Sequence, residues 1–314
     1  MTHAPIILLS TATGDTPTDI TPEELTVVPT IACDCLVKEI ETRGTETPWG
    51  WRLDQSENID HHAPVDRMAR EISSTNLALL RVAAHGIAAP DTRVLITHTD
   101  CDSILSAGII TGRLQPLPHY GAAALAADHT GEPDAIADLL QALMDERDIE
   151  GSFAALAALE EGRPLPPTAA RLLDARRRQR EAAQALVRRG GFEELGAGIY
   201  FAQVEEDTEG EFFPRLLPEA RLIVLGMPHP KYPDPNCPAT GPWLMRVRRG
   251  AAMPAGRDLR HLDLEQYDAH YGGRWNAGSN KRGGGTSVAP RVWAEGLRRR
   301  LSSRAEPAPA GPRA

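Results

Sequence analysis

The sequence is poor in cysteine and aromatic residues, carries no net positive charge and has no long apolar run. Its 314 residues include four cysteines, aromatic residues make up 5%, and the formal net charge is −9. No stretch approaches the roughly 20 apolar residues that cross a bilayer, and the start of the chain lacks the basic segment and apolar core of a signal peptide. Few cysteines without framework spacing fit a reducing compartment. We therefore expect a cytoplasmic protein.

The low aromatic content and the negative net charge also indicate which partners the protein can bind. Long single-stranded nucleic acid usually binds to stacking aromatic residues in a basic channel, and a net negative chain disfavours nucleic acid and acidic membrane surfaces. We expect neither of these partners, and we allow for a homodimer. A local basic pocket for a small phosphorylated ligand stays compatible with the charge. The arginine-rich run at 176–180 could contact nucleic acid, but the solvated face of a connecting helix is the simpler interpretation.

Strand-like and helix-like segments alternate in the first half of the chain. Apolar runs predict strands at 6–9, 27–32 and 91–97, and apolar spacing predicts helices at 65–85 and 103–113. This alternation is typical of a mostly parallel α/β sheet with helices on both faces. Further helices are predicted at 120–127, 133–147, 152–160 and 168–189, strands at 198–204, 221–225 and 243–247, and final helices at 264–271 and 287–301.

The chain is long enough for two domains. We expect the α/β domain to span residues 1–160 and a smaller α+β domain to span 191–301. A glycine- and proline-rich stretch at 162–167 marks the boundary, so residues 161–190 are predicted to form a connecting helix and linker. Residues 302–314, rich in proline and alanine, are predicted to be a disordered tail.

Two short patches rich in acids and histidine stand out in the first half. The first is Asp60-His61-His62, and the second alternates from His98 through Asp100 to Asp102. Each follows apolar residues that could end a strand, and ligands of parallel α/β sheets gather at the carboxyl ends of strands. Alternating residues of an extended chain point to one side. Three histidines and three carboxylates suit a pair of hard divalent ions, and paired ions cleave phosphate esters.

Each patch also has a simpler interpretation. Acids before Ser103 could cap a helix in a surface turn, and Asp60-His61-His62 could be a loop with titratable groups. The presence of both patches in one chain makes the metal interpretation stronger than either patch does alone. Cys33-Asp34-Cys35 has a single residue between its cysteines, unlike zinc-binding pairs, so buried free thiols are expected there.

Four patches carry a resemblance to a known family. Asp60-His61-His62 resembles the signature of the DHH phosphoesterase superfamily, which includes nano-RNases, RecJ-like exonucleases and manganese-dependent inorganic pyrophosphatases. Residues 98–107 resemble its His…Asp-x-Asp-Ser metal motif, and residues 127–131 resemble its Asp-Thr-Gly element. Residues 271–279 are similar to the Gly-Gly-His loop of the companion substrate domain. The similarity covers these patches and the two-domain plan, not the whole length.

The resemblance implies two bound cations, manganese or another divalent ion. His98 and Asp100 would hold one of them, and Asp102, His61 and Asp128 would hold the other. The pair would activate a shared water for attack on phosphorus. The resemblance thus implies that residues 1–160 are the metal-binding catalytic domain.

Two further catalytic roles and one more metal ligand follow from the resemblance. His62 would face the water or the phosphate, and Asp60 would orient the histidines. The family's bridging aspartate has two candidates here, Asp54 and Asp34, of which we prefer Asp54. The motif order is permuted, and one residue instead of three separates His98 from the following aspartate. Parallel strands end at one edge in any order, so the site can survive this permutation.

The glycine-rich segment near the carboxyl end is predicted to bind substrate. Glycines permit close approach of the backbone to a ligand, and basic and amide groups grip phosphate. Arg274 replaces the usual histidine of the family loop. The rigid loop at 227–236, with His229 and Lys231, is predicted to be a pocket wall. The predicted substrate-binding residues are Gly272, Gly273, Arg274, Asn276, Lys281 and Arg282.

We therefore predict a manganese-dependent phosphoesterase for a small phosphorylated or short nucleotide substrate. Two alternatives stay open: a non-catalytic relative that binds a phosphorylated ligand after losing a metal, and a single-metal hydrolase of a non-phosphate ester. Carboxylates that converge within metal distance would favour the phosphoesterase. If both Asp54 and Asp34 lie far from the site, the non-catalytic binding protein is favoured.

Overall fold

The computed structural model describes residues 3–9, 20–62, 71–205, 208–229 and 242–303, with the backbone alone at 302–303. The chain divides into two compact units, Met1–Arg178 and Gln179–Ala314. The division falls inside helix α9 (Pro167–Arg188), within the connecting segment predicted at 161–190. In the described part of the chain, no helix is both long enough and apolar enough to span a bilayer.

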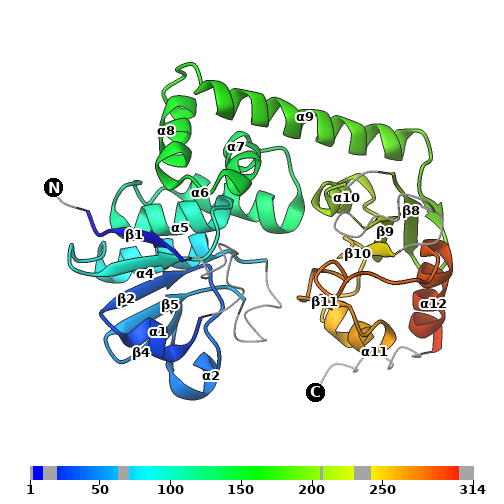
Figure 1. Cartoon of the computed structure of the whole chain (residues 1–314), viewed down its shortest axis with the longest axis horizontal. Coiled ribbons are helices and arrows are strands. Elements are labelled where there is room, and N and C mark those ends of the chain that lie inside the picture. The colour runs from blue at the N-terminus through cyan, green and yellow to red at the C-terminus, as the bar shows by residue number, and fades with distance from the viewer. Residues whose placement is uncertain (1–2, 10–19, 63–70, 206–207, 230–241, 304–314) are drawn as a thin grey trace, which may run out of the picture. The chain divides into compact units, whose positions relative to one another are not determined.

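The first unit contains a six-stranded sheet in the order β1-β6-β2-β5-β4-β3. The first four strands in this order, β1 (Ile6–Leu8), β6 (Arg93–Ile96), β2 (Thr30–Cys33) and β5 (Ser56–Ile59), run parallel (Figure 1). β4 (Gly50–Leu53) and β3 (Thr45–Thr47) extend the sheet by antiparallel pairing. The predicted mostly parallel α/β sheet is confirmed, with an antiparallel edge that the sequence analysis did not foresee.

Both faces of this sheet are covered, as predicted. Successive side chains of a strand point to opposite faces, so Ile31 and Cys33 of β2 lie in one apolar core while Ala32 lies in another. The larger core includes α4 (Ser74–His85), α5 (Cys101–Thr111), α6 (Pro118–Leu125), α7 (Ala135–Leu143) and α8 (Ile149–Glu160). The smaller core includes α1 (Pro22–Thr26) and α2 (Ile40–Arg43), two short helices that were not predicted.

Helix α4 begins later than the sequence analysis predicted. The first six residues of the predicted helix at 65–85 lie outside the described residues, and α4 itself starts at Ser74. Ser73 and Asn76 form a reciprocal capping box, in which each side chain accepts from the other residue's backbone N–H. This cap fixes the amino end of α4 beside the sheet edge described below.

The second unit is a smaller α+β fold, as predicted. Its sheet has the order β11-β12-β10-β9-β8-β7, formed by β7 (Glu193–Glu194), β8 (Ile199–Gln203), β9 (Leu222–Pro228), β10 (Trp243–Arg249), β11 (Gly272–Gly273) and β12 (Ala277–Ser279). Among the described strands of this second sheet, only β8 and β9 pair in parallel. Helices α10 (Phe213–Leu216), α11 (Leu264–Tyr267) and α12 (Pro290–Ser303) complete the unit.

Helix α9 contributes to the cores of both units. Ala169 and Leu173 in its first half pack with residues of α7 and α8, and Ala183 and Leu186 in its second half pack with residues of β8 and β9. The arginine-rich run lies between these positions. Arg176 of this run is buried and pairs with Asp138 at 3.3 Å, so this arginine is not on the solvated face that the sequence analysis expected.

Candidate metal centre

The predicted metal-site residues, except Asp54, gather at one edge of the first sheet. β6, β2 and β5 are neighbours and run parallel, so their carboxyl ends meet at the same edge. Asp34 directly follows β2, Asp60 directly follows β5, and His98 lies two residues after the end of β6. Neighbouring parallel strands therefore bring together side chains that are far apart in the sequence, and the permuted order of the motifs does not matter.

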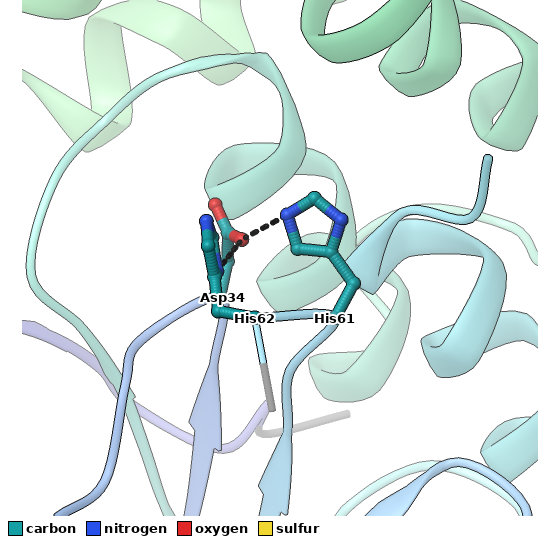
Figure 2. A group of neighbouring side chains, drawn as sticks. All are labelled: Asp34, His61 and His62. Carbon is teal, nitrogen blue, oxygen red and sulfur yellow. Dashed lines mark ion pairs between the residues drawn. The ribbon is translucent and has the colours of Figure 1, made fainter. Parts of the chain in front are cut away.

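Asp34 lies at the centre of this cluster. Its Oδ1 is 3.6 Å from Nε2 of His61 and 3.7 Å from Nδ1 of His62 (Figure 2), and its Oδ2 is 3.2 Å from Nε2 of His98. The carboxylate is buried and also accepts hydrogen bonds from the hydroxyls of Ser74 and Ser103, at 3.0 and 2.9 Å. One carboxylate thus borders two groups of potential metal ligands.

The first group consists of Asp34, His98 and Asp100, whose ligand atoms lie within 4.8 Å of one another. Nε2 of His98 is 3.3 Å from Oδ2 of Asp100. Asp100 is also the amino-terminal cap of α5, because its Oδ1 accepts from the backbone N–H of Ser103 at 3.0 Å. The capping role weighed in the sequence analysis is therefore real, but the second carboxylate oxygen faces His98.

The second group surrounds His61. Its Nε2 is 3.3 Å from Oδ2 of Asp128, and His61, Asp128 and His129 bring their ligand atoms within 4.8 Å of one another. Asp128 and His129 lie in a single π-helical turn, Ala126–Thr130, that follows α6. Nδ1 of His61 bonds to the carbonyl of Ile72 at 2.7 Å, which leaves Nε2 as the nitrogen that faces the carboxylates.

His62 and Asp60 form a close pair beside Asp34. Nδ1 of His62 is 2.7 Å from Oδ1 of the buried Asp60. Burial alone would raise the pKa of Asp60, but the charge and hydrogen bonds of His62 outweigh it and hold that pKa below its usual value. Asp60 is therefore ionised at neutral pH and fixes the orientation of the His62 ring.

Asp102 differs from the other predicted ligands. Both of its oxygens accept from the amino end of α4: Oδ2 from the backbone N–H of Ser74 at 2.7 Å, and Oδ1 from the backbone N–H and hydroxyl of Thr75 at 2.7 and 2.6 Å. Its Oδ2 is 3.9 Å from Nε2 of His61. Asp102 lies near the cluster but belongs to none of the ligand groups found within the described residues.

The structure corrects our choice of Asp54 as the bridging aspartate. Asp54 is exposed in the turn between β4 and β5, before the first residue of β5, whereas Asp60 follows the last residue of that strand. Four strand residues span about 13 Å, so Asp54 lies at the wrong end of β5. Asp34, the other candidate, occupies the position between the ligand groups.

The charges of the centre are unbalanced without a cation. Burial, followed by the charge of Asp34, raises the pKa of Asp102 to about 8. Burial alone would lower the pKa of His98, but Asp100 and Asp34 hold it well above its usual value. Buried carboxylates that raise one another's pKa favour a positive charge between them, which a divalent cation would supply.

The donor set fits divalent cations. Carboxylate oxygens and imidazole nitrogens are borderline-to-hard ligands of the kind that Mn²⁺ and similar ions accept. Oδ2 of Asp60 is buried and has no hydrogen-bond partner within the described part of the chain. A buried carboxylate oxygen without a partner is costly, and a water in a hydrated metal centre would satisfy it.

The predicted substrate-binding residues all lie in the second unit. Gly272 and Gly273 form β11 and are exposed, Asn276 is buried, and Arg274 donates its backbone N–H to Ala277 at 2.7 Å. Lys281 and Arg282 are exposed in the following turn. The segment thus presents a short glycine hairpin with two exposed basic residues near it.

The loop with His229 and Lys231 and the cysteine pair Cys33 and Cys35 were also considered in the sequence analysis. His229 is buried, and its Nε2 bonds to the carbonyl of Lys281 at 2.9 Å, so it anchors the glycine-rich segment. Lys231 lies outside the described residues. Cys33 and Cys35 are buried free thiols, as expected, and burial raises the pKa of both well above the usual value.

The sequence analysis missed three contributors to the centre. Ser74 and Thr75 position Asp34 and Asp102, and His129 belongs to the second ligand group. The run Ser73-Ser74-Thr75-Asn76 is a helix-start signal that places these groups at the amino end of α4. His129 lies in the segment that resembles the Asp-Thr-Gly element, and the sequence analysis considered only the aspartate of that segment, Asp128.

Comparisons with known proteins come from solved structures. No family model and no curated protein matches the chain. The pGpG-specific phosphodiesterase PggH from Vibrio cholerae is similar, with 10% identity and a TM-score of 0.43, over 77% of this chain and 97% of that one. RecJ from Thermus thermophilus in complex with Mg²⁺ is similar with 15% identity and a TM-score of 0.36, over 79% of this chain and 36% of that one. At these TM-scores the matches give no residue roles, which come from the geometry described above.

Proposed function

We propose that this chain is a metal-dependent phosphoesterase of the DHH type, with two cations held on either side of Asp34. The observation that carries the proposal is the position of this carboxylate, whose Oδ2 faces His98 while its Oδ1 faces His61. A carboxylate shared by two ligand groups can hold two cations close together, as hydrolysis of phosphate esters by paired ions requires. His98 and Asp100 complete one group that contains Asp34, and His61 and His62 complete the other. Asp128 joins through His61, with which it forms a further group that includes His129.

The protein's own groups supply orientation and proton transfer. Bound divalent cations would activate a water and neutralise charge on the phosphoryl oxygens. His62 borders Asp34 and is held through Nδ1 by the ionised Asp60, so its other nitrogen can exchange a proton beside the reacting phosphate. The mixed oxygen and imidazole ligands suit Mn²⁺, which we propose as the physiological ion.

The substrate in this proposal is a small phosphorylated compound or a short nucleotide in the cytoplasm. The substrate-binding residues in this proposal are Arg274, Asn276 and the exposed Lys281 and Arg282 of the second unit. A glycine-flanked basic segment matches a phosphate in charge and in access to the backbone. The net charge of −9 supports a small ligand instead of a long nucleic acid.

A non-catalytic binding protein that has lost a metal is the main alternative. The position of Asp34 favours the enzyme, because this residue would supply the bridging carboxylate whose absence would have indicated the binding protein. A single-metal hydrolase of a neutral ester would need neither the second ligand group nor a basic segment.

A screen of divalent ions against mononucleotides, short dinucleotides, cyclic dinucleotides and pyrophosphate tests the proposal. We expect Mn²⁺-dependent phosphate-ester hydrolysis that Asp34→Ala abolishes. Asp54→Ala is the matched control, since it removes an exposed aspartate at the opposite end of β5, and it should keep wild-type turnover. Full activity in Asp34→Ala, or loss of activity in Asp54→Ala, would reject this centre.

A further inference from the structure

The second ligand group contains a residue that the family motifs do not assign. His129 is buried beside His61, with ring centroids 5.4 Å apart and the rings edge-on at 82°. Ligand atoms of His61, Asp128 and His129 lie within 4.8 Å of one another. All three residues are buried, so this group is enclosed by the protein.

The local backbone brings His129 to this position. The family element reads Asp-Thr-Gly, whereas this chain has Asp128-His129-Thr130-Gly131, with one additional residue. The additional residue is accommodated in the π-helical turn Ala126–Thr130, closed by a bond from the backbone N–H of Gly131 to the carbonyl of Ala126 at 2.9 Å. Single π-helical turns are frequent at functional sites.

The carbonyl of Ile72 links the two imidazoles. It lies 2.7 Å from Nδ1 of His61 and 3.1 Å from Nε2 of His129. A carbonyl can only accept, so each of these nitrogens donates, and the lone pair of each neutral ring lies on its other nitrogen. Histidine ligands of metals are commonly fixed by such a bond from the second nitrogen.

The family pattern assigns Asp102 to the cation beside His61 and Asp128, but in this structure Asp102 has a different role. Three hydrogen bonds of 2.6–2.7 Å tie its two oxygens to Ser74 and Thr75 at the start of α4. Coordination of a cation would compete with these bonds at the helix end. Its closest approach to His61 is 3.9 Å, longer than the 3.3 Å of Asp128.

We propose that His129, together with His61 and Asp128, binds the second cation, and that Asp102 positions helix α4 instead of binding metal. This inference rests on the proposed two-cation centre. The second position then has two imidazoles, against one in the group of His98 and Asp100. Imidazole suits Co²⁺, Fe²⁺ and Zn²⁺ better than Mg²⁺, so the second position should select transition ions over Mg²⁺ more strongly than the first.

Calorimetric titration of the full-length, metal-free protein with Co²⁺ and with Mg²⁺ tests this assignment without any substrate. We expect two Co²⁺ ions per chain in the wild type. In His129→Gln one of the two sites should lose affinity by about 100-fold or more, while the glutamine amide can still donate to Ile72. His129→Ala should behave in the same way, and the loss should be larger for Co²⁺ than for Mg²⁺.

Two further variants make the outcomes distinct. Asp102→Asn should keep two Co²⁺ sites, because its effect falls on the hydrogen bonds at the start of α4. His119→Gln changes a half-exposed histidine of α6 that pairs with Glu160, and it should bind Co²⁺ as the wild type does. The assignment of His129 would be overturned if both His129 variants kept two unchanged sites. It would also be overturned if Asp102→Asn lost one site while His129→Gln kept both. Either result would leave the two-cation centre in place. Fewer than two ions in the wild type would overturn both.

Discussion

Asp34 is held in a backbone conformation that few side chains adopt. Its φ of 52° lies in the left-handed region, where a residue other than glycine is strained by about 1–3 kcal/mol. Hydrogen bonds from Ser74 and Ser103 and the backbone bond from Asp34 N–H to the Ile59 carbonyl offset this cost. This unusual φ therefore occurs at the residue that the proposed function places between the two cations.

The ligand residues themselves could be predicted from the sequence, but the residue at their centre could only be narrowed to two candidates, Asp54 and Asp34. His61, His98, Asp100 and Asp128 stand in recognisable motifs, and the structure brings all four to the site. Asp34 has no motif around it, because its role depends on which strand lies between β6 and β5, a feature of topology. Asp54 was preferred for its closeness to Asp60 in sequence, although an intervening strand carries the two residues to opposite ends.

The raised pKa of Asp102 predicts a pH dependence of the metal-free protein. Its folded pKa of about 8 exceeds the ordinary value of 3.8, so between these values the folded chain binds a proton that the unfolded chain has released. This residue therefore makes the free energy of unfolding fall as the pH rises from about 4 to about 8. Asparagine cannot ionise, so the stability of Asp102→Asn relative to the wild type should rise steadily over that range.

Melting temperatures of the two proteins in excess chelator, at several pH values, check this prediction. The difference in stability between the two proteins at any one pH also includes the loss of hydrogen bonds to Ser74 and Thr75 that asparagine cannot reproduce. The change of this difference with pH is therefore the relevant quantity. A relative stability of Asp102→Asn that falls as the pH rises would contradict the raised pKa.

Among the secondary-structure elements, the β4–β5 hairpin determines where Asp60, His61 and His62 emerge. β4 pairs antiparallel with β5, with Trp51 opposite Asn58. Gly50, at the start of β4, approaches the carbonyl of Asn58 so closely that an added Cβ would lie 1.9 Å from its oxygen. The hairpin was not predicted, because each of its strands is only four residues long and its apolar alternation is too brief to recognise.

Gly50→Ala should therefore disturb the hairpin and the centre together. We expect a loss of about 4 kcal/mol in unfolding free energy, from steric overlap and from the positive φ of 151°. Gly86→Ala is the control, since Gly86 also has a positive φ but nothing within 4 Å of an added Cβ, and it should cost about 1–2 kcal/mol. Urea unfolding measures both. Equal losses in the two variants would show that the close approach of β4 to Asn58 is unimportant.

At the scale of the whole molecule, the two units have separate cores joined by one helix. The sequence predicted this helix from its length and its alanine and leucine stripe, and it predicted the α/β and α+β character of the flanking units. The exact position of the division inside α9 could not be predicted, because one continuous apolar stripe serves two different cores, one with Leu173 and one with Leu186. Only the packing partners of each half distinguish them.

Substitutions in the two halves of α9 should destabilise different units. Leu173→Ala and Leu186→Ala each remove a buried side chain, at an expected cost of about 3 kcal/mol. Hydrogen exchange should accelerate in α7 and α8 for Leu173→Ala, and in β8 and β9 for Leu186→Ala. Acceleration throughout the chain in either variant would mean that the two cores unfold as one.

The proposed division of labour between the units gives a further prediction. Arg274→Ala should raise KM about 10- to 100-fold, because a charge-assisted hydrogen bond to substrate phosphate contributes about 1.5–3 kcal/mol. Affinity for Mn²⁺ should stay unchanged, since the ligand groups lie in the first unit. Arg291→Ala, which removes an exposed arginine paired with Glu193, is the control. An unchanged KM in Arg274→Ala would remove Arg274 from the proposed substrate site.

Anomalous diffraction from crystals grown with Mn²⁺ tests the central claim most directly. The account predicts two Mn²⁺ peaks about 3.5–4 Å apart, one beside His98 and Asp100 and one beside His61 and Asp128, with the Asp34 carboxylate between them. A single peak, or two peaks that do not share Asp34, would contradict it.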